Sequence, residues 1–223
     1  MQPKFIVKCL DSRGKFKEGD VLNFEVILFG ELLELYSQYI YVFDTIGQIG
    51  IGPERVKYQL HSISDMCGNI VFKDGYLLKD IETSNIHSYI ESRIDDSNLN
   101  KLSFISHFYP HTNSEHYCFI DDKVLSNCLK IRLDSMNILE EEDKNLLNNM
   151  AQDQSTIAKL HTVVSKRKYY FKKENTHINI PTYSGFIYFN DSLELYLEYF
   201  LACEKFCIGQ NLNMGFGQYF MGG

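Results

Sequence analysis

The side chains best suited to chemistry gather in one basic and aromatic segment, residues 159–173. Its core alternates between cations and rings: Lys166, Arg167, Lys168, Tyr169, Tyr170, Phe171, Lys172 and Lys173. Cations bind phosphates and aromatic rings stack on unpaired bases, so this composition favours contact with a single nucleic-acid strand. The same composition is also typical of an edge strand that its charges protect from aggregation. Both interpretations fit the sequence.

Seven histidines are the side chains most able to transfer protons near neutral pH, because an unperturbed imidazole has a pKa of about 6.5. His161 is the first candidate, since it lies in the basic segment shortly before Ser165 and Arg167. The alternative is a histidine on a helix surface with no such role. A second group, His107, His111 and His116, falls in the run SHFYPHTNSEHY. These three histidines either form a second proton-transfer centre or are solvated side chains at a turn.

The composition narrows the class of protein. The net charge of -7 and the sequence pI near 5.5 argue against nonspecific nucleic-acid binding, so any RNA site must be local. The six cysteines form no CxxC pair, and we predict reduced thiols, no metal and no cofactor. No apolar stretch approaches the roughly 20 residues of a membrane-spanning helix. We therefore expect a soluble, cytoplasmic protein with no membrane contact.

Hydrophobic periodicity predicts alternating strands and helices. Residues 21–30 alternate as a strand, 32–46 have helical spacing, and a glycine-punctuated loop leads to a predicted strand over 55–63. Further strands are predicted at 70–78, 102–108 and 117–120, and helices at 84–93, 124–138 and 144–160. Near the C-terminus the strand, helix and glycine loop recur at 185–190, 193–205 and 207–217, before a last strand at 216–221. This internal repeat indicates a duplicated β-α-β unit, unless two helices rich in Leu and Tyr are alike by chance.

The most specific motif is the loop FCIGQNLNMGFGQYF, which places Gly209, Gly215 and Gly217 around a polar insert. Glycines at such positions permit a positive φ and let the backbone lie close to a phosphate or to another chain. With its flanking strand and helix, this loop resembles the C-terminal part of the RAMP superfamily of CRISPR proteins, and within it the precursor-crRNA processing endoribonucleases. Residues 19–52, 102–110 and 164–168 also resemble family segments. Gln210, Lys168 and Val164 depart from the usual family residues.

The resemblance implies an α+β fold of tandem ferredoxin-like (RRM-like) β-α-β units with antiparallel sheets. We expect an N-terminal part over residues 1–100, whose completeness is left open, and a C-terminal part over 101–223 that carries the glycine-rich loop. The implied ligand is CRISPR repeat RNA, and other CRISPR effector subunits are candidate partners. Whether the chain forms a homodimer is left open.

The implied reaction is metal-independent cleavage, in which the RNA 2′-hydroxyl attacks the adjacent phosphate. On this basis we predict His161, Ser165 and Arg167 as catalytic residues. The predicted RNA contacts are Lys166, Lys168, Tyr169, Tyr170, Lys172, Lys173, Gly209, Gln210, Asn211, Asn213, Gly215 and Gly217. In family members the catalytic histidine often lies in the N-terminal half of the chain. Two alternatives stay open: a noncatalytic RAMP subunit that holds crRNA, and a protein-interaction module without RNA contact.

Overall fold

The computed structural model describes residues 4–9, 15–51, 54–111, 119–171 and 176–223. The chain divides into two compact units, one formed by Met1–Ile27 with Ile90–Gly223 and the other by Leu28–Tyr89. The predicted division into residues 1–100 and 101–223 remains a prediction. Among the described residues no helix is both long enough and apolar enough to cross a bilayer.

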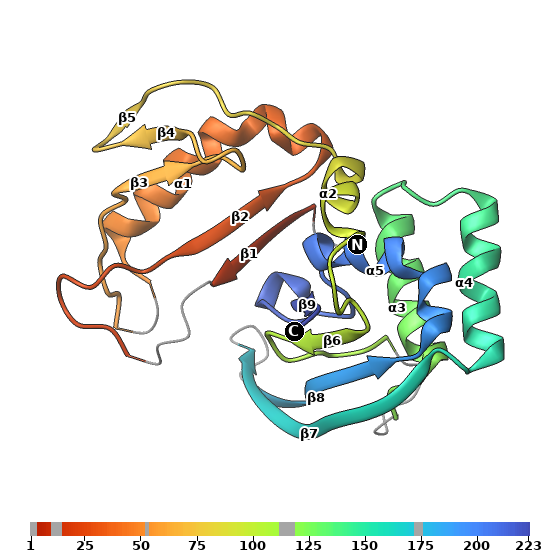
Figure 1. Cartoon of the computed structure of the whole chain (residues 1–223). Helices are drawn as coiled ribbons and strands as arrows, with labels where there is room; N and C mark the ends of the chain where they lie inside the picture. The colour runs from red at the N-terminus through yellow and green to blue at the C-terminus, as the bar shows by residue number, and fades with distance from the viewer. Residues whose placement is uncertain (1–3, 10–14, 52–53, 112–118, 172–175) are drawn as a thin grey trace. The chain divides into compact units, whose positions relative to one another are not determined.

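The larger unit is built on a four-stranded antiparallel sheet in the order β7-β8-β6-β9. The strands are β6 (Lys101–Phe104), β7 (Ile157–Phe171), β8 (Thr176–Phe189) and β9 (Tyr219–Met221). Strands β7 and β8 form a long curved hairpin, and β7 is one of the two edge strands of this sheet (Figure 1). The short strands β1 (Phe5–Cys9) and β2 (Phe24–Leu28) make a separate two-stranded sheet.

One face of the four-stranded sheet forms the core of this unit. Leu102, Ile187 and Met221 alternate along their strands with more exposed residues, and none of the three is exposed to solvent. The helices of this unit are α3 (Asp122–Ser135), α4 (Glu141–Asp153) and α5 (Leu197–Phe206). Their buried faces contribute Leu125, Leu129, Leu147, Met150, Phe200 and Leu201. The period-two pattern of the strands therefore leaves the opposite sheet face for other roles.

The smaller unit pairs a helix with a small sheet. A 3-10 turn η1 (Gly30–Leu35) leads into α1 (Tyr36–Ile49), and β3 (Ser62–Ser64), β4 (Ile70–Lys73) and β5 (Tyr76–Leu77) form an antiparallel sheet. Helix α2 (Ile86–Arg93) follows, and its residues from Ile90 onward belong to the larger unit. The predicted strand over 55–63 is wrong: apart from an isolated bridge between Ile51 and Val56, only its end lies in β3. The predicted strand over 70–78 is a hairpin, because Asp74 and Gly75 adopt positive φ and turn the chain.

The α+β class with antiparallel sheets and β-α-β units is confirmed. The predicted helix over 144–160 ends earlier, at Asp153, because Gln154 is left-handed and Ile157 begins β7. His161 is therefore a strand residue, not a helix residue. Of the predicted strand over 117–120, residues 117 and 118 lie outside the described residues, and residues 119 and 120 are not in a strand.

Candidate nucleic-acid interface

The β7–β8 hairpin positions the basic segment. Ser165 pairs with Thr182 and Arg167 with Ile180 across the two strands. Because side chains alternate along a strand, Ser165 and Arg167 share one face, and Lys166 and Lys168 lie on the other. Arg167, Lys166 and Lys168 are all exposed. The backbones of Tyr169 and Tyr170 belong to β7, but their side chains lie outside the described parts, as do Lys172 and Lys173.

A histidine from another segment meets this hairpin. The Arg167 guanidinium contacts Nε2 of His107, while Nδ1 of His107 lies 3.5 Å from Oγ1 of Thr182. Oγ1 of Thr182 is 3.2 Å from Oγ of Ser165 and also donates to the Ser165 carbonyl oxygen at 3.2 Å. The structure thus brings together His107, Arg167, Thr182 and Ser165, which we call the His107 cluster.

The backbone around His107 explains its orientation. The amide of Phe108 donates to the carbonyl of Tyr183, and the amide of Tyr183 donates to that of Phe108, each at 2.8 Å. Phe108 is fully buried and stacks on Phe104, with 4.9 Å between ring centroids. Neighbouring side chains in an extended segment point to opposite sides, so burying Phe108 directs His107 toward Thr182 and Arg167.

Hydrogen-bond chemistry defines the protonation state of His107. A guanidinium can only donate, so Nε2 of His107 must accept, and its proton is then on Nδ1, facing Thr182. Burial and then the nearby Arg167 charge lower the pKa of His107 below its ordinary value of 6.5. This lowering of the pKa favours the neutral imidazole, the form that a general base requires.

The glycine-rich loop lies against the same segment. The amide of Gly217 donates to the His107 carbonyl at 2.8 Å, and the amide of Gln210 donates to the Tyr109 carbonyl at 2.7 Å. The side-chain amide of Gln210 also donates to the Pro110 carbonyl at 2.9 Å. Residues 107–110 therefore lie between the loop and β8, and they connect the loop to the basic hairpin.

The glycines of the loop allow close approaches within the chain itself. A Cβ at Gly209 would overlap the carbonyl oxygen of Tyr109, and one at Gly217 would overlap that of Ile208. Both glycines are buried, whereas Asn213 is exposed and Asn211 and Gly215 are partly exposed. Sequence reasoning allowed an approach to a phosphate or to another chain, whereas the approach that the structure shows is to the chain's own backbone. A role for these residues in RNA contact stays a prediction.

His161 lies apart from the His107 cluster. It is exposed on β7 opposite Phe186, and the two ring centroids are 4.8 Å apart. Four residues of strand separate it from Ser165, which corresponds to about 13 Å. The structure therefore brings Ser165 and Arg167 together with His107 and not with His161. Sequence reasoning placed His107 in a second centre but gave no signal for its contact with Arg167.

The remaining candidate groups differ in accessibility. His111 is half-buried, and burial lowers its pKa despite a hydrogen bond with the Gly209 backbone. His116 lies outside the described residues. Among the described residues, no cluster of three or more His, Cys, Asp or Glu could hold a metal ion. Cys203 and Cys207 are buried free thiols, and burial raises the pKa of Cys207 to about 11.

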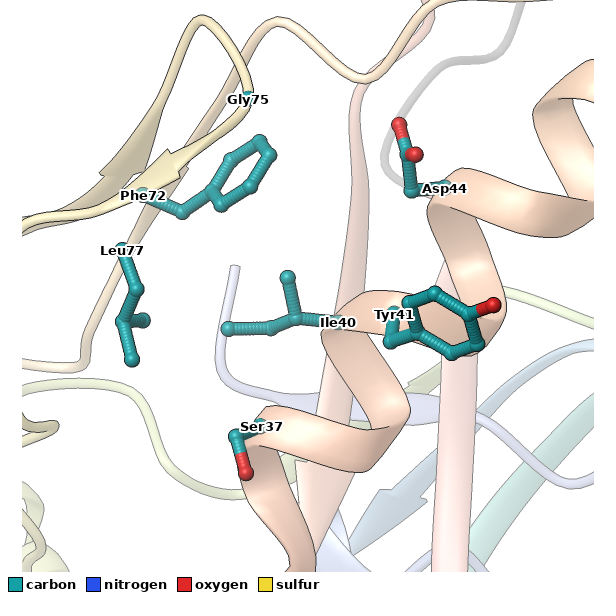
Figure 2. A pocket seen from close by; sticks show the side chains of 7 residues that line it. All are labelled: Ser37, Ile40, Tyr41, Asp44, Phe72, Gly75 and Leu77. Atoms are coloured by element: carbon teal, nitrogen blue, oxygen red, sulfur yellow. The ribbon is translucent and has the colours of Figure 1, made fainter.

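A cavity of about 210 Å³ lies in the smaller unit, between α1 and the β4–β5 hairpin (Figure 2). Ile40, Tyr41, Phe72 and Leu77 contribute most of its lining. Among the described residues that line it, Asp44 is the one charged side chain, and none is Lys, Arg or His. An anionic, largely apolar wall is unsuited to phosphate, so this cavity is not part of the candidate interface.

Comparisons with known proteins identify solved structures with a similar fold. The sequence model of the family AF_1859_N, described as an N-terminal domain, matches residues 2–83, and no curated protein matches the chain. Among solved structures, a product complex of the Cas6 protein TTHB231 is similar with a TM-score of 0.60 and 11% identity, covering 99% of this chain and 82% of that chain. A product complex of the Cas6 protein TTHA0078 is similar with a TM-score of 0.54 and 12% identity, and the match covers 100% of this chain and 83% of that chain.

A third similar structure is a partial Cas6-RT-Cas1–Cas2 complex, with a TM-score of 0.58 and 14% identity. The match covers 98% of this chain but only 38% of that chain. At these identities the likeness concerns the fold. The chain therefore has a Cas6-like fold, with its antiparallel sheets and β-α-β units.

Proposed function

We propose that the chain binds CRISPR repeat RNA and cleaves it at the His107 cluster, without a metal, through attack of a 2′-hydroxyl on the adjacent phosphate. The observation that carries the proposal is the contact between Arg167 and His107, a histidine of lowered pKa, at the edge of the sheet. The Cas6-like fold and the family motifs of the sequence support the same ligand class.

In the proposed reaction, Arg167 changes partner when RNA binds. Its guanidinium turns from Nε2 of His107 to the scissile phosphate, where it stabilises the charge of the transition state. The Nε2 lone pair is then free to take the proton of the 2′-hydroxyl. The attack forms a cyclic 2′,3′-phosphate and breaks the bond to the 5′-oxygen, which takes a proton from water at this exposed edge.

Thr182 and Ser165 act as positioning residues in this proposal. The Nδ1 proton of His107 is directed at Thr182, which holds the tautomer whose Nε2 can serve as a base. Thr182 is fully buried and is itself held by both the hydroxyl and the carbonyl of Ser165. The hydroxyl groups thus fix the imidazole and do not touch the reacting atoms.

The other predicted contacts extend the interface along the RNA. Lys166 and Lys168 lie on the opposite face of the hairpin from Arg167, and with Lys172, Lys173, Tyr169 and Tyr170 they are proposed to hold the backbone and unpaired bases. In the loop, Gln210, Asn211 and Asn213 are the proposed polar contacts. Gly209, Gly215 and Gly217 are proposed to shape the loop on which those contacts stand.

The test is single-turnover cleavage of a labelled repeat RNA in EDTA, with the product ends identified. We expect cyclic phosphate products. His107→Ala is expected to lower the rate by about 10²- to 10⁴-fold, and Arg167→Ala by about 10²- to 10³-fold. His87→Ala, which removes an exposed histidine on α2, is the matched control and should leave the rate unchanged.

Other outcomes distinguish the alternatives. Loss of cleavage in His161→Ala, with normal rates in His107→Ala, would return the base role to His161. Tight, salt-dependent binding without any cleavage would identify a noncatalytic subunit that holds crRNA, and no RNA affinity at all would leave the protein-interaction module.

A further inference from the structure

A row of aromatic rings crosses the open face of the four-stranded sheet. His161 on β7 pairs with Phe186 on β8, Phe186 pairs with Ser103 on β6, and Ser103 pairs with Phe220 on β9. Residues directly opposite one another on adjacent antiparallel strands point to the same face. The three rings therefore share the face opposite the buried core residues. Tyr188, two residues after Phe186, belongs to the same face.

The rings of His161, Phe186 and Tyr188 contact one another, and solvent reaches all four rings. The ring of Phe186 lies 4.8 Å from that of His161 at an interplanar angle of 32°, and 5.5 Å from that of Tyr188 at 75°. His161 is exposed, Phe220 is 43% exposed, and Phe186 and Tyr188 are partly exposed. A row of aromatic side chains that solvent can reach is unusual for a sheet face that only packs against protein.

Cations accompany the rings. Nζ of Lys101 lies 5.1 Å from the centroid of Phe186 and 5.9 Å from that of Tyr188. Lys159 is exposed and pairs with Tyr188 from the other side. Arg93 lies 4.7 Å from the centroid of Phe220, but its charge is shared with Glu204 and Asp96. In a chain with a net charge of -7, two lysines beside this group of rings give the surface a local positive charge that would favour a polyanion.

We propose that this surface, the aromatic platform of His161, Phe186, Tyr188, Phe220 and Lys101, binds the unpaired bases of an RNA strand. Bases stack on the rings, and Lys101 and Lys159 contact the flanking phosphates. The platform gives His161 a stacking role in place of proton transfer. It rests on the proposed function and deepens it, because it assigns a single-stranded segment of the substrate to a defined surface.

The platform and the His107 cluster are continuous along β7. His161, Ser165 and Arg167 point to the same side of that strand, at separations of about 13 and 20 Å from His161. An RNA strand that stacks on the platform can therefore continue to Arg167 without leaving the sheet face. This continuity favours RNA over a protein as the occupant, because the phosphates of an RNA strand would contact the positive charge of Arg167 at the end of the surface.

Tryptophan fluorescence tests the stacking directly, because the chain contains no tryptophan. Phe186→Trp places one indole in the platform, and Tyr76→Trp places one at a 73% exposed position on β5 as the matched control. Repeat RNA with a single-stranded flank is expected to quench the indole at residue 186 and to leave the one at residue 76 unchanged. Equal responses at both positions would overturn the proposal.

Binding measurements separate the platform from the proposed function. Phe186→Leu and Tyr188→Leu should each weaken binding of a single-stranded oligonucleotide by about 5- to 150-fold. The cleavage rate of a bare repeat hairpin at saturation should stay at the wild-type value, as should that of the control Tyr76→Leu. Normal hairpin cleavage with unaltered single-strand affinity in both platform variants would refute the platform alone. A wild-type chain that binds neither RNA would refute both proposals.

Discussion

The clearest quantitative prediction concerns two glycines of the same loop. Gly217 and Gly215 both have positive φ, +73° and +83°, so an alanine at either position carries a left-handed backbone that costs about 1–2 kcal/mol. A Cβ at Gly215 meets nothing within 4 Å, whereas one at Gly217 overlaps the Ile208 carbonyl. Only the second substitution forces the backbone to move.

That movement breaks specific hydrogen bonds. Gly217 donates to His107 at 2.8 Å and accepts from the Ile208 amide at 3.0 Å, and each bond contributes about 0.5–1.5 kcal/mol. Gly217→Ala should therefore lower the free energy of unfolding by about 2–5 kcal/mol and Gly215→Ala by about 1–2 kcal/mol. A difference of about 2 kcal/mol corresponds to roughly 4–8 °C in Tm for a chain of this size.

Thermal and urea unfolding of the two variants, followed by circular dichroism, measure this difference. Because the two alanines share the chemistry and the backbone region, only the clash at residue 217 separates them. Equal losses of stability, or a larger loss at residue 215, would refute the close approach of Gly217 to the Ile208 carbonyl.

Three further predictions follow from the site and the core. The cleavage rate should rise with pH to a plateau, with its midpoint below pH 6.5, because the base is active only when unprotonated and burial lowers the pKa of His107; a midpoint above pH 7 would contradict this. Thr182→Val should lower the single-turnover rate but not RNA affinity, and NMR of the His107 ring nitrogens should show a changed tautomer population; an unaltered spectrum would remove the positioning role. In native protein a thiol reagent should modify the exposed Cys9 and Cys67 before Cys128, whose pKa burial raises to about 12, and rapid labelling of Cys128 would contradict its burial.

Local patterns were sufficient to predict several elements. The helical spacing of residues 32–46 matches η1 and α1, and the repeat of a strand, a helix and a glycine loop matches β8, η2 (Asp191–Leu195), α5 and the final loop. Such elements depend mostly on the period of nearby apolar side chains. Helix α2 was predicted to within two residues for the same reason.

The errors occur where pairing at long range decides the structure. The sequence pattern predicts that the helix continues through residues 154–160. In the structure Ile157 pairs with Phe189, and β7 begins there. The contact between His107 and Arg167 joins residues that are 60 positions apart. No periodic pattern in the sequence connects residues so far apart. Sequence analysis could therefore select histidine as the residue type suited to the chemistry, but only the fold shows which histidine contacts Arg167.

The central claim is that His107 and Arg167 act as one unit on RNA, and a double-mutant cycle tests it most directly. Single-turnover cleavage would be measured in EDTA for His107→Ala, Arg167→Ala and the combined variant. When two residues act together, replacing both lowers the cleavage rate by a much smaller factor than the product of the two single reductions. We expect the double variant to be about as slow as the slower single variant. Losses that simply multiply would show that the two side chains act independently and would contradict the account.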